Sequence, residues 1–163
     1  MPSSVVKNFT DGTIKVEDGA GSPASYTCTF DEGNLSISGL AQQLNEVATY
    51  ESRGTLKSVR HTARSYPSGS FSLMLTDVSD GSDSTLIDFL MKQGSHSGLV
   101  STLGANADVY AVKVTLTVEG TDHGDSADHT LVMDDCHCMV DLAEGDPNTV
   151  TVNFTVYGSI TMT

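Results

Sequence analysis

The chain has 163 residues and a mass of 17.2 kDa, a length that suits one domain and buries about 70% of the surface of the unfolded chain. Its 21 acidic and 8 basic residues give a net charge of −13, which repels nucleic acid and anionic membranes and argues against a sequence-reading nucleic-acid binder. With 38% hydrophobic and 18% charged residues, the composition excludes collagen-like, coiled-coil and wholly disordered chains.

No segment looks like a targeting signal or a membrane span. The first residues, Met1 to Lys7, lack a basic start followed by an apolar run, and no window approaches the roughly 18 consecutive apolar residues that a span requires. Three cysteines form neither a disulfide framework nor a paired zinc motif, which suits a reducing compartment. We therefore expect a protein that is made in a cytoplasm and does not span a membrane.

Short alternating apolar segments predict a series of strands in the first half of the chain, each bounded by Gly, Asp, Asn or Ser turn residues. Between them, the segment from Leu40 to Val47 fits either a short helix or the descending limb of a long hairpin, and we favour the extended form. An extended hairpin or loop is thus expected around residues 40–70, within one domain over residues 1–163. The short strands expected along the whole chain centre on Ile14/Val16, Tyr26/Cys28/Phe30, Leu35/Ile37, Phe71/Leu73/Leu75 and Cys136/Cys138/Val140/Leu142.

Half of the positive charge falls in this hairpin region. Residues 53–64 contain Arg53, Lys57, Arg60 and Arg64 and no acid, a local charge of +4, whereas residues 1–52 sum to −5 and residues 65–163 to −12. One interpretation is a solvated basic hairpin. The other is a protrusion that docks on acidic surface of another copy of the chain, because subunits this acidic otherwise repel one another. The four cations are therefore candidate subunit contacts.

A helix is predicted from about Leu86 to Gln93, with Thr85 and Asp88 as a capping box and Gly94 as its C-terminal stop. Its broad apolar face indicates packing against a sheet. The following residues, 94–108, are long enough for a mobile loop.

The clearest strands come in the second half of the chain. Apolar residues alternate with polar ones from Tyr110 to Val118 and again from Thr149 to Val156. Six or more antiparallel strands and one flanking helix predict a mainly β (α+β) fold, an antiparallel sandwich or barrel.

Residues capable of metal or catalytic chemistry occur without a complete motif. Asp122 to His129 and Asp134 to Cys138 concentrate carboxylate, imidazole and thiol, but strand alternation puts Cys136 and Cys138 on one face and His137 on the other. The acidic run from Asp77 to Asp88 departs from the EF-hand pattern in its glycine and its last acid. Nucleophile-elbow and phosphate-loop motifs are also missing. We assign no catalytic, cofactor-binding or metal residues, and favour a structural role.

Several short sequence segments, taken together, resemble the tail tube (major tail) proteins of long-tailed bacteriophages. Their order and spacing extend over most of the chain. They are Asn8–Ile14, Phe30–Leu35, Glu51–Leu56, Asp128–Leu131, and the run Glu144, Gly145, Asp146, Pro147 and Asn148 that leads into the final strand.

The resemblance implies a barrel-like tail tube fold with one flanking helix, in which six copies close into a ring and rings stack into a hollow tube for DNA ejection. It implies a virion protein, assembled in the host cytoplasm, that is no enzyme, needs no cofactor and contacts no membrane in the free tail. The implied partners are other copies of itself, a tape-measure protein, baseplate or tail-tip proteins, tail-terminator proteins and, in contractile tails, a sheath. Genomic DNA passes through without sequence-specific binding.

Other classes remain open at this point. The main alternative is a small acidic β-sandwich module that binds a ligand or a metal, and a distant third is a metal-assisted hydrolase that uses His123, Asp125, His129 and Cys136. If the protein belongs to a tail, the sequence does not distinguish a contractile from a non-contractile tail. It also does not distinguish a main tube subunit from a related tail-completion ring protein.

Overall fold

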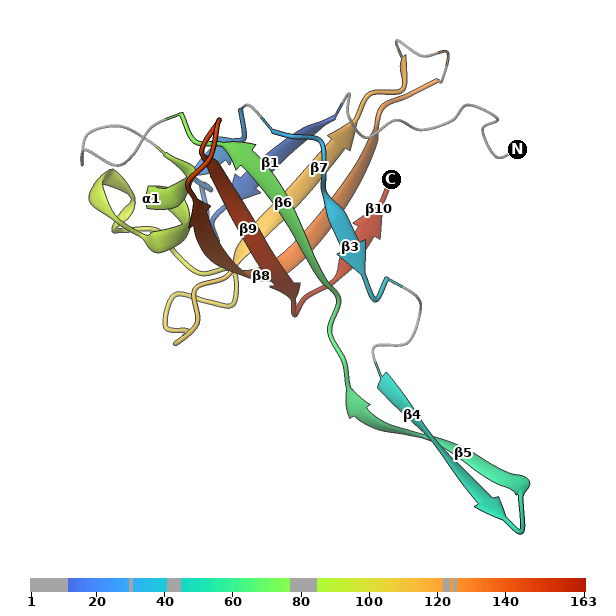
Figure 1. Ribbon diagram of the computed structural model, residues 1–163. Helices are drawn as coiled ribbons and strands as arrows, with labels where there is room; N and C mark the ends of the chain where they lie inside the picture. The colour runs from blue at the N-terminus through green and yellow to red at the C-terminus, as the bar shows by residue number, and fades with distance from the viewer. Residues whose placement is uncertain (1–11, 30, 41–44, 77–84, 122–123, 125) are drawn as a thin grey trace.

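The computed structural model describes residues 12–29, 31–40, 45–76, 85–121, 124 and 126–163 (Figure 1). These residues form mainly strands, with one α-helix and a short 3-10 helix. In chain order the elements are β1 (Thr13–Glu17), β2 (Ser25–Thr27), β3 (Ser36–Ser38), β4 (Asn45–Ser52), β5 (Thr55–Arg64), β6 (Ser68–Met74), α1 (Leu86–Met91), η2 (Gly94–His96), β7 (Val112–Val118), β8 (His129–Ala143), β9 (Thr149–Val156) and β10 (Ile160–Met162).

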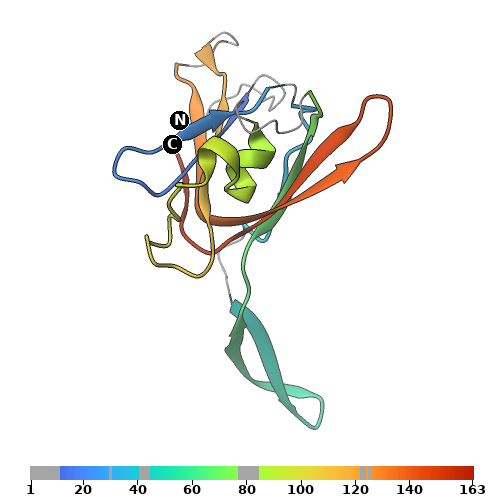
Figure 2. The same cartoon turned by 90° about the vertical axis from the view of Figure 1, so that its left-hand side faces the viewer.

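Eight strands form one antiparallel sheet in the order β2-β1-β7-β8-β9-β6-β3, with β10 also paired to β8. The long strand β8 turns the sheet back on itself. Its first part pairs with β7 and β10, and its second part, from Cys136 to Ala143, pairs with β9. Between the two parts, the register with β7 shifts and Asp135 adopts a φ of 54°, which marks a bulge. The result is two facing layers joined at a corner (Figure 2).

The core lies between these layers, and its inward residues follow the predicted alternation. Every second residue of β7, from Val112 to Val118, is buried, as is every second residue of β9, from Val150 to Val156. Each such side chain contributes about 1.5–3 kcal/mol by leaving water. The predicted fold, mainly antiparallel β with one helix, is confirmed, although the strand expected from Tyr110 begins at Val112.

The helix α1 lies between the two layers and buries Leu86, Phe89 and Leu90 against them (Figure 2). Its start is as predicted, since the Thr85 hydroxyl accepts a hydrogen bond from the Asp88 amide at 3.1 Å. The reciprocal half of the capping box is missing: the fully buried Asp88 carboxylate accepts no hydrogen bond from any described residue, because Asp is shorter than the Glu or Gln of a complete box. No described helix has the length and apolar character to cross a bilayer.

The helix also ends earlier than predicted. It stops at Met91, and Lys92, with a φ of 54°, takes the left-handed position that was expected of Gly94. The ammonium group of Lys92 lies 5.3 Å from the centre of the Tyr110 ring.

The segment expected to be a mobile loop, residues 94–108, contains η2 and is tied to the body. The Asp18 carboxylate accepts a hydrogen bond from the Val100 amide at 3.0 Å, and the Gly19 amide donates to the Val100 carbonyl at 2.8 Å. Gly19 permits this approach, because a Cβ there would lie 2.3 Å from the Ser101 carbonyl oxygen. The Ser101 hydroxyl bridges the loop by donating to the Val109 carbonyl at 2.8 Å.

Strands β4 and β5 form a separate two-stranded sheet that projects from the body (Figures 1 and 2). Arg53 and Gly54 close it with φ values of 53° and 76°, the two positive angles of a type I′ turn. We call residues 45–64 the hairpin arm. An isolated two-stranded hairpin is at best marginally stable in water, so a contact with a partner would stabilise the arm.

Candidate functional site

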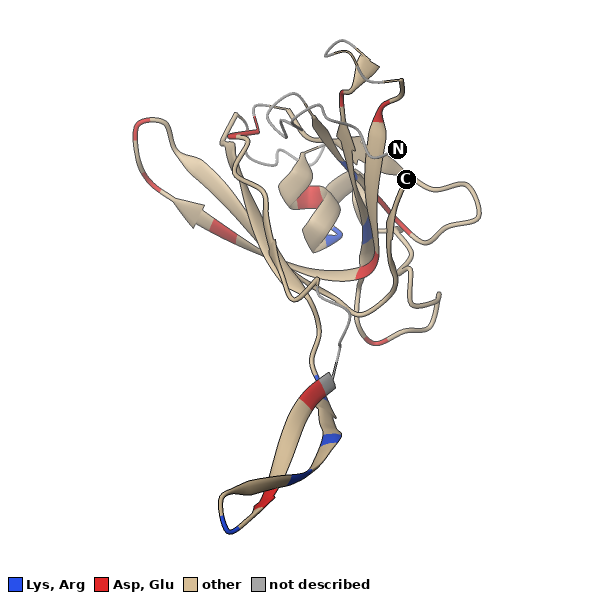
Figure 3. Ribbon diagram, turned by 90° about the vertical axis from the view of Figure 1, so that its right-hand side faces the viewer, with Lys and Arg blue, Asp and Glu red and all other residues tan. Residues whose placement is uncertain are grey.

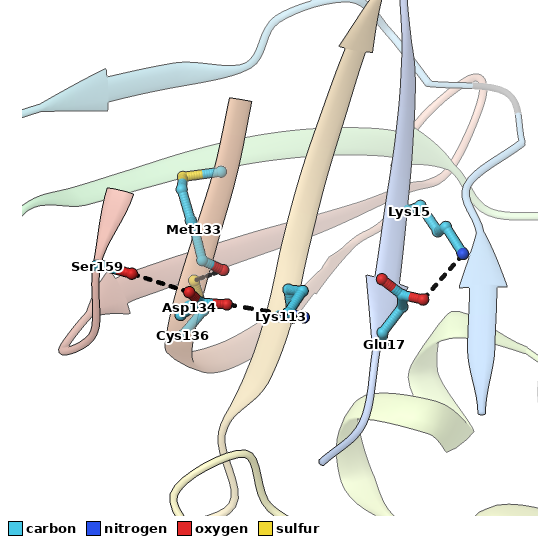
Figure 4. Close-up of polar contacts among 7 residues, drawn as sticks. All are labelled: Lys15, Glu17, Lys113, Met133, Asp134, Cys136 and Ser159. Carbon is cyan, nitrogen blue, oxygen red and sulfur yellow. Dashed lines mark hydrogen bonds and ion pairs between the residues drawn. The ribbon is translucent and has the colours of Figure 1, made fainter. Parts of the chain in front are cut away.

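The hairpin arm carries all four predicted contact residues, and all four are exposed. Arg53 lies in the turn at its tip, and Lys57, Arg60 and Arg64 lie along β5. The described ion pairs of the molecule, Lys15–Glu17 and Lys113–Asp134, involve none of these four (Figures 3 and 4). The arm also carries Glu46 and Glu51, so its net charge is +2, on a protein whose net charge is −13 (Figure 3).

Arg64 differs from the other three because it lies at the base of the arm. Its guanidinium lies 5.2 Å from the centre of the Tyr66 ring, a cation–π geometry. Tyr66 in turn packs edge-on against Tyr157 at 4.8 Å, which connects the base of the arm to the segment between β9 and β10. Arg64 thus helps to hold the arm to the body, and Arg53, Lys57 and Arg60 lie farther out.

Apolar residues accompany the cations on the arm. Val47 and Val59 are 47% and 55% exposed, and the pairing of Thr49 with Val59 and of Val47 with His61 puts both valines on one face. Tyr50 and Leu56 are more than half exposed as well. A basic arm with an uncovered apolar face has the composition of a contact surface.

A second surface is the outer face of the layer formed by β3, β6, β9 and the end of β8, which we call the hydroxyl face. The register aligns Ser68 with Thr155 and Ser70 with Asn153, and a hydrogen bond of 3.0 Å joins the hydroxyls of Ser72 and Thr151. Neither Lys nor Arg occurs on these strand segments. The members are Ser36, Ser38, Ser68, Ser70, Ser72, Thr149, Thr151, Asn153 and Thr155.

The face carries one carboxylate, that of Asp141, which accepts a hydrogen bond from the Asn153 side-chain amide at 2.7 Å. The alternation in the sequence predicts the polar side of β9 but not its continuation across β6 and β3. The serines at positions 36, 38, 68, 70 and 72 join this face because β6 and β3 lie beside β9 in the strand order.

The segment Glu144–Asn148 forms the exposed loop between β8 and β9. The Asn148 side-chain carbonyl accepts a hydrogen bond from the Gly145 amide at 2.8 Å, and the Asn148 main-chain carbonyl accepts one from the Leu75 amide at 2.8 Å. The Asp146–Pro147 peptide is cis. In this chain the motif organises a turn, and a role in assembly stays a prediction.

The cysteine and histidine cluster is divided as strand alternation predicted. Cys136 is fully buried and Cys138 packs against the core, whereas His137 is paired opposite Thr155 on the outer side. No group of three or more potential ligands gathers among the described residues. Of the residues considered for metal chemistry, Asp122, His123, Asp125 and the run 77–84 lie outside the described part of the chain.

Burial raises the pKa of the Cys28 and Cys136 thiols to about 12. It also raises the pKa of the Cys138 thiol. Thiols with raised pKa values stay protonated near neutral pH, and a protonated thiol is neither a good nucleophile nor a metal ligand. Cys28 and Cys136 are buried in the core, and Cys138 is a partly buried thiol packed against it.

We expect native protein at pH 8 to react with iodoacetamide at least about a hundredfold more slowly than the same protein unfolded in guanidinium, where all three thiols have ordinary pKa values near 8.5. Mass spectrometry at timed intervals counts the modified thiols. Rapid native labelling of Cys136 would contradict the burial argument. Because the folded-state pKa values are raised, the thiols' contribution to stability is present below about pH 9 and is lost as pH rises toward 12.

The fold resembles chains in solved structures of an extracellular contractile injection system and of a prophage baseplate. A chain of the extracellular contractile injection system "PVC sheath/tube terminator in extended state" aligns with a TM-score of 0.57 and 12% identity over 100% of this chain and 97% of that chain. A chain of the anti-feeding prophage baseplate, 6-fold symmetrised, gives 0.52 and 12%, with the same coverage. A chain of the PVC sheath-tube complex in the extended state gives 0.52 and 9%, over 92% of this chain and 87% of that one.

No family model and no curated protein matches the sequence. At identities of 9–12% the structural likeness establishes a shared fold, which extends over nearly the full length of both chains.

Proposed function

We propose that this protein is a structural subunit of a phage-type tail, and that copies of it close into hexameric rings that stack into the hollow tail tube. The observation that carries the proposal is the separation of charge between an exposed basic arm and an acidic body. Arm and body are different surfaces, so a contact between them is head-to-tail, and such contacts build rings and open-ended stacks. The structural neighbours support a tail role, because they come from assemblies described as sheath, tube, terminator and baseplate.

The hydroxyl face is the surface we propose for the lumen. Uncharged Ser, Thr and Asn side chains offer phosphate only neutral hydrogen bonds, and the absence of Lys and Arg from these strand segments removes the stronger charge-assisted contacts. Six copies at −13 each carry −78 per ring, so a passing DNA is repelled overall. Such a wall lets genomic DNA slide through during ejection.

The partners follow from this role. A tape-measure protein occupies the lumen before ejection, baseplate or tail-tip proteins start the tube, and terminator proteins end it. A sheath surrounds the tube if the tail is contractile. The protein then works in the extracellular particle after assembly in the host cytoplasm.

The test is negative-stain electron microscopy of the purified protein over a range of concentration and salt. We expect rings at low concentration and hollow tubes of uniform diameter as concentration rises, because a head-to-tail contact is self-propagating. Added salt screens repulsion between bodies and attraction by the arm alike, so assembly should have an intermediate salt optimum. A monomer at every concentration and salt, even with added tail-tip proteins, would contradict the proposal.

A further inference from the structure

An apolar groove of about 490 Å³ opens between β3 and the layer that contains β7, β8 and β10. Large apolar side chains are in contact with water there, since Leu40 is 41% exposed and Met162 is 65% exposed. Contiguous apolar depressions of this kind mark interaction sites, so the groove favours an apolar occupant. Its apolar walls are Leu35, Ile37 and Leu40 on one side and Leu116, Leu131 and Met162 on the other.

The described part of the chain begins beside this groove. β1 starts at Thr13 and lies next to β7 (Figure 1). Thr13 pairs with Thr117, and the neighbours of Thr117 in the chain, Leu116 and Val118, both line the groove. Paired strands are roughly 4.8 Å apart. The residues that precede Gly12 therefore join the described chain about one strand spacing from the β7 wall of the groove.

The sequence of those residues suits an apolar groove. Residues 1–11, which we call the N-terminal segment, contain Val5, Val6 and Phe9. An extended chain spans roughly 3.3 Å per residue, so Phe9 can reach about 10 Å from residue 12 and Val5 about 23 Å. Residues 1–10 contain Lys7 and no acid, so the acidic body does not repel them.

The tether favours the segment of the same chain over that of another copy. A short flexible linker holds a ligand near its site at an effective concentration in the millimolar range, which exceeds the concentration of other copies in a dilute solution. The point of attachment beside Val118 therefore decides between the two sources of the same apolar residues.

We infer that the groove between β3 and β10 is the docking site for the N-terminal segment of the same chain, which covers the groove with Val5, Val6 and Phe9. The contact closes the apolar opening between the two layers in the free subunit. It goes beyond the proposed tail function and does not depend on it, because it forms within a monomer.

Cross-linking within one chain tests the contact. Asn8→Cys with Met162→Cys puts one thiol beside Phe9 and the other in the groove, and a short bismaleimide is added at low protein concentration. The matched control, Asn8→Cys with Met91→Cys, moves the second thiol to α1, where Met91 is 53% exposed and does not line the groove. We expect at least about tenfold more intrachain cross-link to position 162, counted by mass spectrometry of the proteolysed protein. The native thiols react slowly because their pKa values are raised.

Charge substitution in the segment gives a second measurement. Val6→Asp with Phe9→Asp should displace the segment and raise the fluorescence of the apolar dye anilinonaphthalene sulfonate at least about threefold, because exposed apolar surface binds this dye. The matched control, Ser3→Asp with Ser4→Asp, adds the same charge to the same segment and removes no apolar side chain. We expect its dye fluorescence to equal that of the wild-type protein.

The outcomes decide the inference without reference to assembly. Equal cross-linking to positions 162 and 91, or equal dye fluorescence from the two aspartate variants, would overturn it. A cross-link that forms only between chains, in a mixture of the single variants N8C and M162C, would put the segment in the groove of another copy and overturn the intrachain contact. All of these measurements are made on dilute protein, so a failure to form rings or tubes would contradict the proposed function and leave the docking site standing.

Discussion

Reversing two charges on the hairpin arm, with Lys57→Glu and Arg60→Glu, is expected to abolish assembly while leaving the monomer folded. Both side chains are exposed and neither forms a described ion pair, so folding loses little. In an arm-to-body contact, each new carboxylate faces acidic surface, and like-charge juxtaposition costs several kcal/mol. A loss of about 3 kcal/mol raises the critical concentration for assembly more than about a hundredfold. The critical concentration is measured by centrifuging a concentration series and determining how much protein pellets.

The matched control changes the same net charge on the body. Lys15→Glu with Lys113→Glu removes two cations whose partners, Glu17 and Asp134, lie on the sheet. These exposed or half-exposed pairs contribute about 0–1 kcal/mol each, so the control should fold and keep most of its assembly. If both double variants lose assembly equally, net charge and not the arm is responsible. Normal tubes from the arm variant would refute the role of these cations.

Phe89→Ala is expected to lower the free energy of unfolding by about 3–5 kcal/mol, a large part of the roughly 5–15 kcal/mol that a domain of this size has. Phe89 is 0% exposed, between the two layers, and its ring lies 5.2 Å from that of His96. Removing it leaves a cavity at the point where α1 closes the space between the layers. Urea unfolding, monitored by circular dichroism, measures the difference in the free energy of unfolding between the wild-type protein and the variant.

Met91 provides the control on the same helix. Its side chain is 53% exposed, so Met91→Ala should change the free energy of unfolding by less than about 0.5 kcal/mol. Equal losses from both substitutions would mean that the helix contributes through its own formation and not through packing of Phe89.

Strand periodicity predicted most of this fold, because burial on one face leaves a pattern of period two. The runs around Val114 and Val152 were predicted on that basis and form β7 and β9. The corner at Asp135 was not predictable, since a non-glycine residue with positive φ has no reliable sequence mark and the bulge depends on pairing with β7. The end of α1 at Met91 was missed for the same reason, because Lys92 took the left-handed cap.

The candidate site was predictable only in part. The run from Arg53 to Arg64 is visible as charge, and the alternation of Cys136, His137 and Cys138 indicated their separation. The hydroxyl face depends on strands far apart in sequence, such as β3 beside β6. Local patterns carry no information on that order, so this surface required the three-dimensional structure.

The edges of the sheet have a consequence for how the protein behaves at high concentration. β2, β3 and β10 contain three residues each. Long unpaired edges act as templates for amyloid-like growth, and short ones are a common protection against it. The main sheet therefore exposes little backbone to indiscriminate strand addition, and the long open edges are those of β4 and β5, which are confined to the hairpin arm.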